Sequence, residues 1–193
     1  SGNFPHWNNV HYLDTSHMMA AFAVAYDWCF DAWKPDQLNF MEEKMVKHAL
    51  SLSYNEYRRQ GCWWPVVNIN WNAVCNGGTM CGAMALLDVY PEVASVMIEN
   101  AKRAMEYVMP TYYPEGAWPE GGGYWRYALG YVVRTIMSFR NTFGTDFNFA
   151  KAPGLDGTGW YGTYLAGSTG MYSIGDTSGG FIDNPHIMWF ARE

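Results

Sequence analysis

The sequence has few of the features that mark metal, redox and membrane proteins. Its four cysteines, Cys29, Cys62, Cys75 and Cys81, form no CxxC pair and have no matching histidine cluster, so neither a zinc site nor a thioredoxin-type site is expected. Buried free thiols are expected instead. Cys75 and Cys81 cannot bridge each other, because six residues on one predicted helix point them in different directions. A bridge from Cys29 or Cys62 remains open. No motif calls for a cofactor.

Long apolar runs and a leader are also missing. The chain has no stretch of about eighteen apolar residues and no charged-then-apolar start, so membrane insertion is not expected. It begins at Ser1 rather than methionine, and it stops at Glu193 directly after a new apolar run. We therefore expect a portion of a longer protein. Nothing in the sequence indicates its oligomeric state.

Basic residues are fewer than acidic ones. The chain has 12 Lys and Arg against 18 Asp and Glu, a formal net charge of −6, which repels polyanions at long range. Nucleic acid is therefore not an expected partner. A few sugars of an acidic polysaccharide respond instead to the local field of a cleft, which Arg126, Arg134 and Arg140 could supply. Each arginine could equally be solvated or paired with a nearby acid.

Aromatic residues and helical periodicity are what the sequence has in abundance. Aromatics make up 18% of the chain, which suits either a large core or flat surfaces for sugar stacking. Hydrophobic residues recur at helical spacing, and no segment has a convincing strand pattern. The predicted helices cover Ser16 to Trp33, Pro35 to about Arg59, about Trp71 to Val89, Pro91 onward, the segment after Gly123 to about Phe143, and a short stretch at Trp160 to Ala166. The pattern predicts an all-α domain of antiparallel helical hairpins.

Local signals refine these helices. Asp14, Thr15 or Ser16 can cap the first helix, and His48 on the second is expected to be solvated. Gly78 and its neighbours form a small-residue seam on the third helix, where another helix could approach closely. The members of this seam are Gly78, Gly82 and Ala85.

The fifth predicted helix has a polar and an apolar face. Tyr124, Tyr127, Tyr131 and Arg134 follow one another at steps of three, four and three, which places them on one side. Four polar-tipped side chains are hard to bury unpaired, so this face is expected to open onto a groove. The opposite face is expected to be buried, and it carries Leu129, Val132, Val133 and Ile136.

Two motifs are candidates for a functional site. The first, residues 68–78, crowds four asparagines around Trp71 at the mouth of a predicted helix. The second, residues 115–127, joins two carboxylates, a glycine triplet, two tyrosines and Arg126. Together they resemble the heparinase II/III-like polysaccharide lyases and the related alginate lyases, over roughly residues 26–176.

The resemblance implies a fold, an activity and a location. The helices of residues 1–193 would form a single domain, part of an incomplete α/α toroid with the cleft on its concave side. Relatives carry a β-sandwich domain after the toroid, and we expect that domain to lie outside residues 1–193. The implied activity is β-elimination in a uronic-acid-containing glycan, an acidic polysaccharide or oligosaccharide. The implied location is the periplasm or the outside of a bacterial cell.

β-Elimination requires neutralisation of the sugar carboxylate, a base for the C5 proton and an acid for the leaving oxygen. By resemblance, Asn70 or Asn72 would bind the carboxylate and Tyr127 would be the acid or base, with Tyr124 as the alternative tyrosine. Where many relatives have histidine, residues 68–76 have none. The other residues expected to bind substrate are Trp71, Trp118, Glu120, Tyr124, Arg126, Tyr131 and Arg134. Each of the tyrosines and asparagines could instead serve packing or helix capping.

Two rival functions stay open. Glu115 and Glu120 could act as the paired carboxylates of an α/α-toroid glycoside hydrolase. Glu120 could instead hold Arg126 or cap the fifth helix, and Trp118 beside it could stack on a sugar ring. The second rival is a carbohydrate-binding helical domain without catalysis. The reaction product separates the rivals, because elimination leaves a conjugated double bond and hydrolysis does not.

Overall fold

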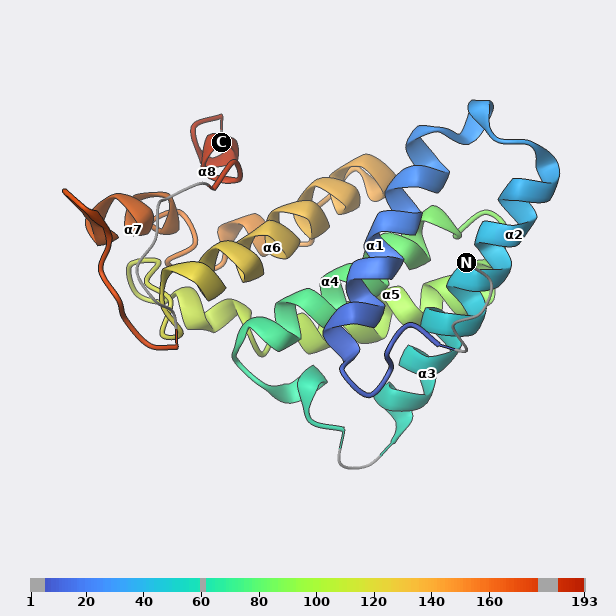
Figure 1. Ribbon diagram of the computed structural model, residues 1–193, viewed down its shortest axis with the longest axis horizontal. Coiled ribbons are helices and arrows are strands. Elements are labelled where there is room, and N and C mark those ends of the chain that lie inside the picture. The colour runs from blue at the N-terminus through green and yellow to red at the C-terminus, as the bar shows by residue number, and fades with distance from the viewer. Residues whose placement is uncertain (1–5, 60–61, 177–183, 193) are drawn as a thin grey trace. The chain divides into compact units, whose positions relative to one another are not determined.

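The computed structural model describes residues 6–59, 62–176 and 184–192, and it is an all-α fold (Figure 1). The fold class predicted from the sequence is therefore confirmed. The only strands among these residues are Ala166–Gly167 (β1) and Gly170–Met171 (β2), which pair antiparallel. The α-helices are α1 Tyr12–Trp28, α2 Pro35–Met45, α3 Ser51–Arg58, α4 Asn70–Ala85, α5 Pro91–Met105, α6 Gly122–Phe143, α7 Thr158–Leu165 and α8 Ile187–Phe190.

The chain divides into two compact units. The first unit comprises residues 1–66 and 74–105, and the second comprises residues 67–73 and 106–193. Helix α4 contributes its first residues to the second unit and the remainder to the first. Both candidate motifs therefore supply residues to the second unit.

Helices α1 and α4 approach closely in the first unit, as the small-residue seam predicts. A Cβ atom on Gly78 would collide with the backbone oxygen of Ser16, and one on Gly82 would collide with the side chain of Met19. The hydroxyl of Ser16 donates to the carbonyl of Cys75 at 3.3 Å across the same contact. Glycine is required here because a neighbouring helix occupies the space of its side chain.

The start of α1 differs from the sequence expectation. The helix begins at Tyr12, so Asp14, Thr15 and Ser16 lie inside its first turns, and no side chain caps it. Thr15 donates instead to the carbonyl of Trp7 at 2.6 Å. Hydroxyls near a helix start can bond several local acceptors, and the sequence does not show which one wins.

The long second helix is continuous but changes pitch. Between α2 and α3 the backbone of Val46–Leu50 forms a π-helical segment. This segment turns His48 inward, where it is only 6% exposed and its ring centroid lies 5.5 Å from that of Trp7. The expectation of a solvated His48 is therefore wrong, because the wider turn alters which residues face the core.

Helix α6 builds the core of the second unit. Its expected apolar face is buried, with Leu129, Val132 and Ile136 fully inaccessible and Val133 6% exposed. The helix follows Gly121, whose φ is +89°, and it ends at Gly144 with φ +70°. Both values favour glycine, which explains why the helix starts and stops at these positions.

The loop before α6 is tied to α7. The hydroxyl of Thr158 donates to the carbonyl of Gly116 at 2.6 Å and accepts from the indole of Trp125 at 2.9 Å. Gly116 has φ +84°, and a Cβ atom there would collide with the backbone of Thr158. These contacts hold residues 115–121 in one conformation within the second unit.

All four cysteines are free: Cys75 and Cys81 are buried, Cys62 is half-buried and Cys29 is exposed. Within the described ranges, every helix falls short of the length and apolar character that a membrane span requires.

Candidate functional site

Glu120 lies at the centre of a hydrogen-bonded cluster in the second unit. One carboxylate oxygen, Oε1, accepts from the side-chain amide of Asn70 at 2.6 Å. The other, Oε2, accepts from the backbone N–H of Asn70 at 2.7 Å and from the indole of Trp118 at 3.1 Å. The backbone oxygen of Glu120 accepts from the N–H of Asp176 at 3.2 Å. We call Asn70, Trp118 and Glu120 the Glu120 cluster.

The geometry gives Glu120 a structural task. Asn70 is the first residue of α4, where backbone N–H groups have no partner within the helix and the helix dipole favours a negative charge. Glu120 supplies both the acceptor and the charge. The expectation of helix capping is correct in kind, but the capped helix is α4 rather than α6. Its partner is Asn70 rather than Arg126.

Trp118 belongs to the core. It is 1% exposed, and its ring centroid lies 5.1 Å from that of the fully buried Tyr112. Its carbonyl accepts from the hydroxyl of Tyr161 at 2.8 Å. A ring enclosed in this way has no free face, so the expectation that Trp118 stacks on a sugar is wrong. Its indole N–H donates to Glu120, and buried tryptophans usually have such a hydrogen-bond partner.

The asparagines at the start of α4 are buried. Asn70 is 2% exposed and Asn72 is fully inaccessible, while Trp71 between them is half-buried. Asn72 lies in the first turn of the helix rather than at its cap. The side-chain oxygen of Asn70 is buried with no hydrogen-bond partner. The amide nitrogen of Asn70 therefore serves Glu120, and its oxygen is the one acceptor in the cluster that remains unused.

The polar face of α6 brings several predicted residues together. Tyr127 meets Tyr131 edge to face, with ring centroids 6.0 Å apart, and the Arg134 guanidinium lies 5.0 Å from the Tyr131 ring centroid. Tyr131 is buried, Tyr124 and Tyr127 are half-buried, and Arg134 is exposed. We call Tyr124, Tyr127, Tyr131 and Arg134 the α6 row. Tyr131 is enclosed, so its expected contact with substrate is wrong, whereas Tyr124, Tyr127 and Arg134 keep part of their side chains accessible.

His186, which sequence reasoning left without a role, lies against α6. Its Nε2 atom is 2.7 Å from the position that a Cβ atom on Gly130 would take. Burial, and after it the positive charges of Arg134 and Arg126, lower the pKa of His186 below its ordinary value. Gly130 in the middle of α6 was the available sequence signal, because a helix-interior glycine often marks a close approach.

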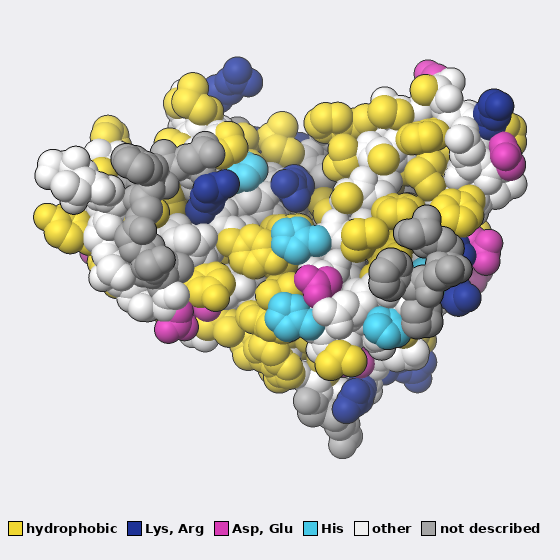
Figure 2. All heavy atoms as spheres, viewed as in Figure 1, with side chains coloured by type: hydrophobic (Ala, Val, Ile, Leu, Met, Phe, Trp, Pro, Cys, Tyr) yellow, Lys and Arg dark blue, Asp and Glu magenta, His cyan; other side chains and the backbone are white. Residues whose placement is uncertain are grey.

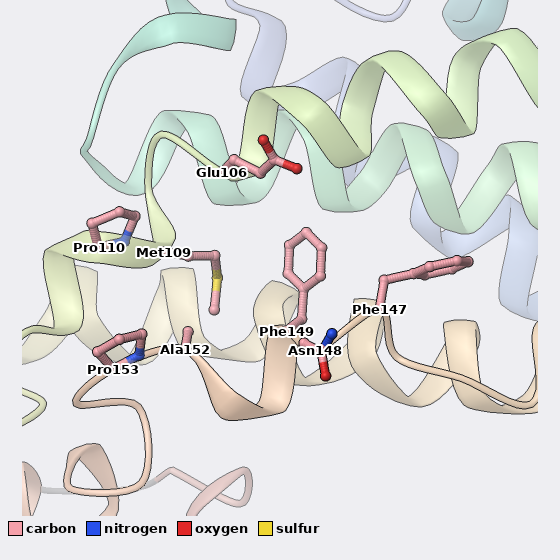
Figure 3. A pocket seen from close by; sticks show the side chains of 8 residues that line it. All are labelled: Glu106, Met109, Pro110, Phe147, Asn148, Phe149, Ala152 and Pro153. Carbon is pink, nitrogen blue, oxygen red and sulfur yellow. The ribbon is translucent and has the colours of Figure 1, made fainter.

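A surface pocket lies elsewhere in the second unit (Figure 3). It has a volume of about 190 Å³, and Phe149 and Met109 point into it while Glu106 stands at one side. Phe147 and Asn148 beside it adopt positive φ angles of 53° and 67°. The pocket is lined by Glu106, Met109, Pro110, Phe147, Asn148, Phe149, Ala152 and Pro153. None of the site residues predicted from the sequence lines this pocket.

Among the described residues, no three His, Cys, Asp or Glu side chains are gathered as a metal ion would require. No protein-family model matches the chain, and no curated protein matches it.

Proposed function

We propose that this chain is the helical portion of a polysaccharide lyase that cleaves a uronic-acid-containing glycan by β-elimination. The observation that carries the proposal is the α6 row. In this row the half-buried Tyr127 contacts the ring of Tyr131, and the guanidinium of the exposed Arg134 lies over the same Tyr131 ring. A tyrosine with an ordinary pKa near 10 needs a nearby cation or donor before it can serve as a base near neutral pH. The resemblance of residues 68–78 and 115–127 to heparinase II/III-like lyases supports the same activity.

In this proposal Tyr127 transfers the proton. It accepts the C5 proton of the uronic acid or donates to the departing O4, and Tyr124, one turn earlier, is the alternative. Arg134 and Arg126 supply positive charge for the sugar carboxylate. The arginines take the carboxylate-binding role that was expected of Asn70 or Asn72, because both asparagines are buried at the start of α4 and Asn70 donates to Glu120.

The proposed substrate is an acidic polysaccharide or oligosaccharide. The net charge of −6 opposes long-range attraction of a polyanion, whereas the two exposed arginines on α6 provide local attraction over about one Debye length, roughly 8 Å. An α/α-toroid arrangement of the helices, a following β-sandwich domain and a periplasmic or extracellular location belong to the proposal through the resemblance.

The test is product formation by the full-length protein on uronic-acid glycans. Elimination creates a conjugated double bond that absorbs ultraviolet light, so wild-type protein should produce this absorbance. Tyr127→Phe removes one hydroxyl and keeps the ring, and it should lower the rate by about 10² to 10⁴. Unchanged turnover in Tyr127→Phe with a folded protein would remove Tyr127 from the mechanism.

The glycoside hydrolase alternative makes the opposite prediction. New reducing ends without ultraviolet absorbance would indicate hydrolysis by Glu115 and Glu120. In that case Glu120→Gln would be inactive with an unchanged melting temperature. The three hydrogen bonds to Glu120 argue against hydrolysis by this residue. A general acid must carry a proton on its carboxyl group, whereas both oxygens of Glu120 accept hydrogen bonds.

A non-catalytic carbohydrate-binding domain is the second candidate, and helix α7 favours it. Trp160 and Tyr164 are four residues apart on α7 and are 65% and 78% exposed, so both side chains lie on one side of the helix at the surface. Exposed aromatic faces bind sugars by stacking. Glycan binding without turnover by the full-length protein, lost in Trp160→Ala, would support this function over the lyase.

A further inference from the structure

Helix α8 packs along α6 within the second unit. The imidazole of His186 covers Gly130, and one turn later the indole of Trp189 donates to the sulfur of Met137 at 3.1 Å. The Arg140 guanidinium lies 5.6 Å from the Trp189 ring centroid. The start of α8 is fixed by Asn184, whose side-chain oxygen accepts from the backbone N–H of His186 at 3.1 Å. His186 is thus held in place at the side of α6.

The position that His186 occupies lies between two arginines. Arg126, Gly130 and Arg134 are four residues apart, so they follow one another along one side of α6. The missing side chain of Gly130 leaves the space into which the imidazole fits. Both arginines are exposed and His186 is half-buried. Figure 2 shows histidine and basic side chains gathered over α6.

Three side chains that can donate N–H hydrogen bonds, Arg126, His186 and Arg134, adjoin one another at α6. We propose that Arg126, His186 and Arg134 form a binding site for one anionic group of a sugar, a carboxylate or a sulfate. The arginines offer planar pairs of N–H donors that match the oxygens of either anion. His186 adds a third donor at the midpoint. The site rests on the proposed function for its substrate class and names the residues that neutralise the sugar's charge.

A bound anion would change the proton balance of the site. In the unliganded protein the charged groups acting on His186 are Arg134 and Arg126 of α6, which together with burial disfavour its protonated form. Helix α7 packs on α8 through Gly159 and Phe190, and its sequence contains no Asp, Glu, Lys, Arg or His. An anion between the arginines offsets their charge, so it should be bound together with a proton on His186.

The experiment is an NMR titration of the His186 ring in the full-length protein between about pH 5 and 8. The probes are sodium glucuronate, glucose 6-sulfate and uncharged glucose, and His186→Gln assigns the signal. Glucuronate or glucose 6-sulfate should raise the pKa of His186, and glucose should leave it unchanged. A larger effect of glucuronate identifies a carboxylate site, and a larger effect of glucose 6-sulfate identifies a sulfate site. An unchanged pKa with both saturating anions overturns the proposal.

Variants connect the effect to the arginines. Arg126→Gln and Arg134→Gln should each weaken glucuronate binding about tenfold, the loss expected for one charge-assisted hydrogen bond. The exposed Lys151→Gln is the matched control and should bind as the wild type does. Equal binding by all three variants overturns the site. If glucuronate shifts His186 but no unsaturated product forms, the anion site stands and the lyase function falls.

Discussion

Tyr12 of the first unit and Tyr127 of the second unit differ in burial and in hydrogen bonding. In the first unit the hydroxyl of Tyr12 lies 2.6 Å from Ser53 Oγ, which lies 3.2 Å from the hydroxyl of Thr79, and all three residues are buried. Tyr57 donates to the side-chain oxygen of Asn76 at 2.6 Å. In the second unit Tyr127 is half-buried, in a row that ends at an exposed arginine.

This difference separates structural tyrosines from candidate reactive ones. Burial raises the pKa of Tyr12 well above the ordinary value of a phenol. A phenol that resists ionisation makes a poor base near neutral pH, yet it is a reliable partner inside a buried network. The Tyr12 hydroxyl is therefore held in a buried contact of the first unit, whereas Tyr127 on α6 stays partly accessible in the second.

The largest stability effect is expected where the first unit is tightest. Gly78→Ala places a methyl group against the backbone oxygen of Ser16, which cannot rotate away, so the free energy of unfolding should fall by about 3 kcal/mol. Gly159→Ala on α7 meets only an ordinary contact, 3.4 Å from Phe190, and should be neutral or stabilising by up to about 1 kcal/mol. Urea denaturation measures both. Equal changes in unfolding free energy for Gly78→Ala and Gly159→Ala would show that the contact at Gly78 is no tighter than the one at Gly159.

A smaller loss is expected at the Glu120 cluster. Glu120→Gln replaces an acceptor with an N–H₂ group that faces donors of Asn70 and Trp118, so the unfolding free energy should fall by about 2 kcal/mol. Glu115→Gln, on an exposed side chain, should change it by less than about 0.5 kcal/mol. Thermal unfolding of the two variants decides whether Glu120 is structural. A stable but inactive Glu120→Gln would instead favour carboxylate catalysis.

Substitutions of Tyr12 and Tyr127 provide a paired test, with an expected change in unfolding free energy of about 1 kcal/mol for Tyr12. Tyr12→Phe leaves Ser53 with one partner fewer in a buried chain, so the unfolding free energy should fall by about 1 kcal/mol while turnover stays normal. Tyr127→Phe should show the reverse, with stability nearly unchanged and turnover lost. Urea denaturation and the product assay are needed together. If both variants lose stability and neither loses activity, the division between the two kinds of tyrosine fails.

Local patterns predicted helices well, and they failed wherever a partner was distant in sequence. Pro91 begins α5 as expected, and α6 ends at Phe143 as expected, because both limits depend on neighbouring residues. The contact between Asn70 and Glu120 spans fifty residues, so no local pattern could show which helix Glu120 caps. His186 reaches Gly130 from a helix of four residues, too short for a periodic signal.

The smallest predicted effect is the pH dependence that His48 gives the first unit. Burial, and after it the charge of Lys47, lower the pKa of His48 below 6.5. Below about this pH the unfolded chain binds more protons at His48 than the folded chain does, so stability falls as the pH is lowered. His48→Gln should flatten this decline, measured as melting temperature between about pH 5 and 7.5.

The exposed His17 supplies the control, because its replacement by glutamine should alter the decline less. Adding glucuronate distinguishes the contribution of His48 to the acid decline from that of His186, whose pKa is also lowered by burial and by nearby positive charges. An anion held by Arg126 and Arg134 of α6 should weaken only the His186 contribution, since His48 lies in the π-helical segment of the first unit. An acid decline that is identical in His48→Gln and wild type would show that this buried histidine does not govern the pH dependence of stability.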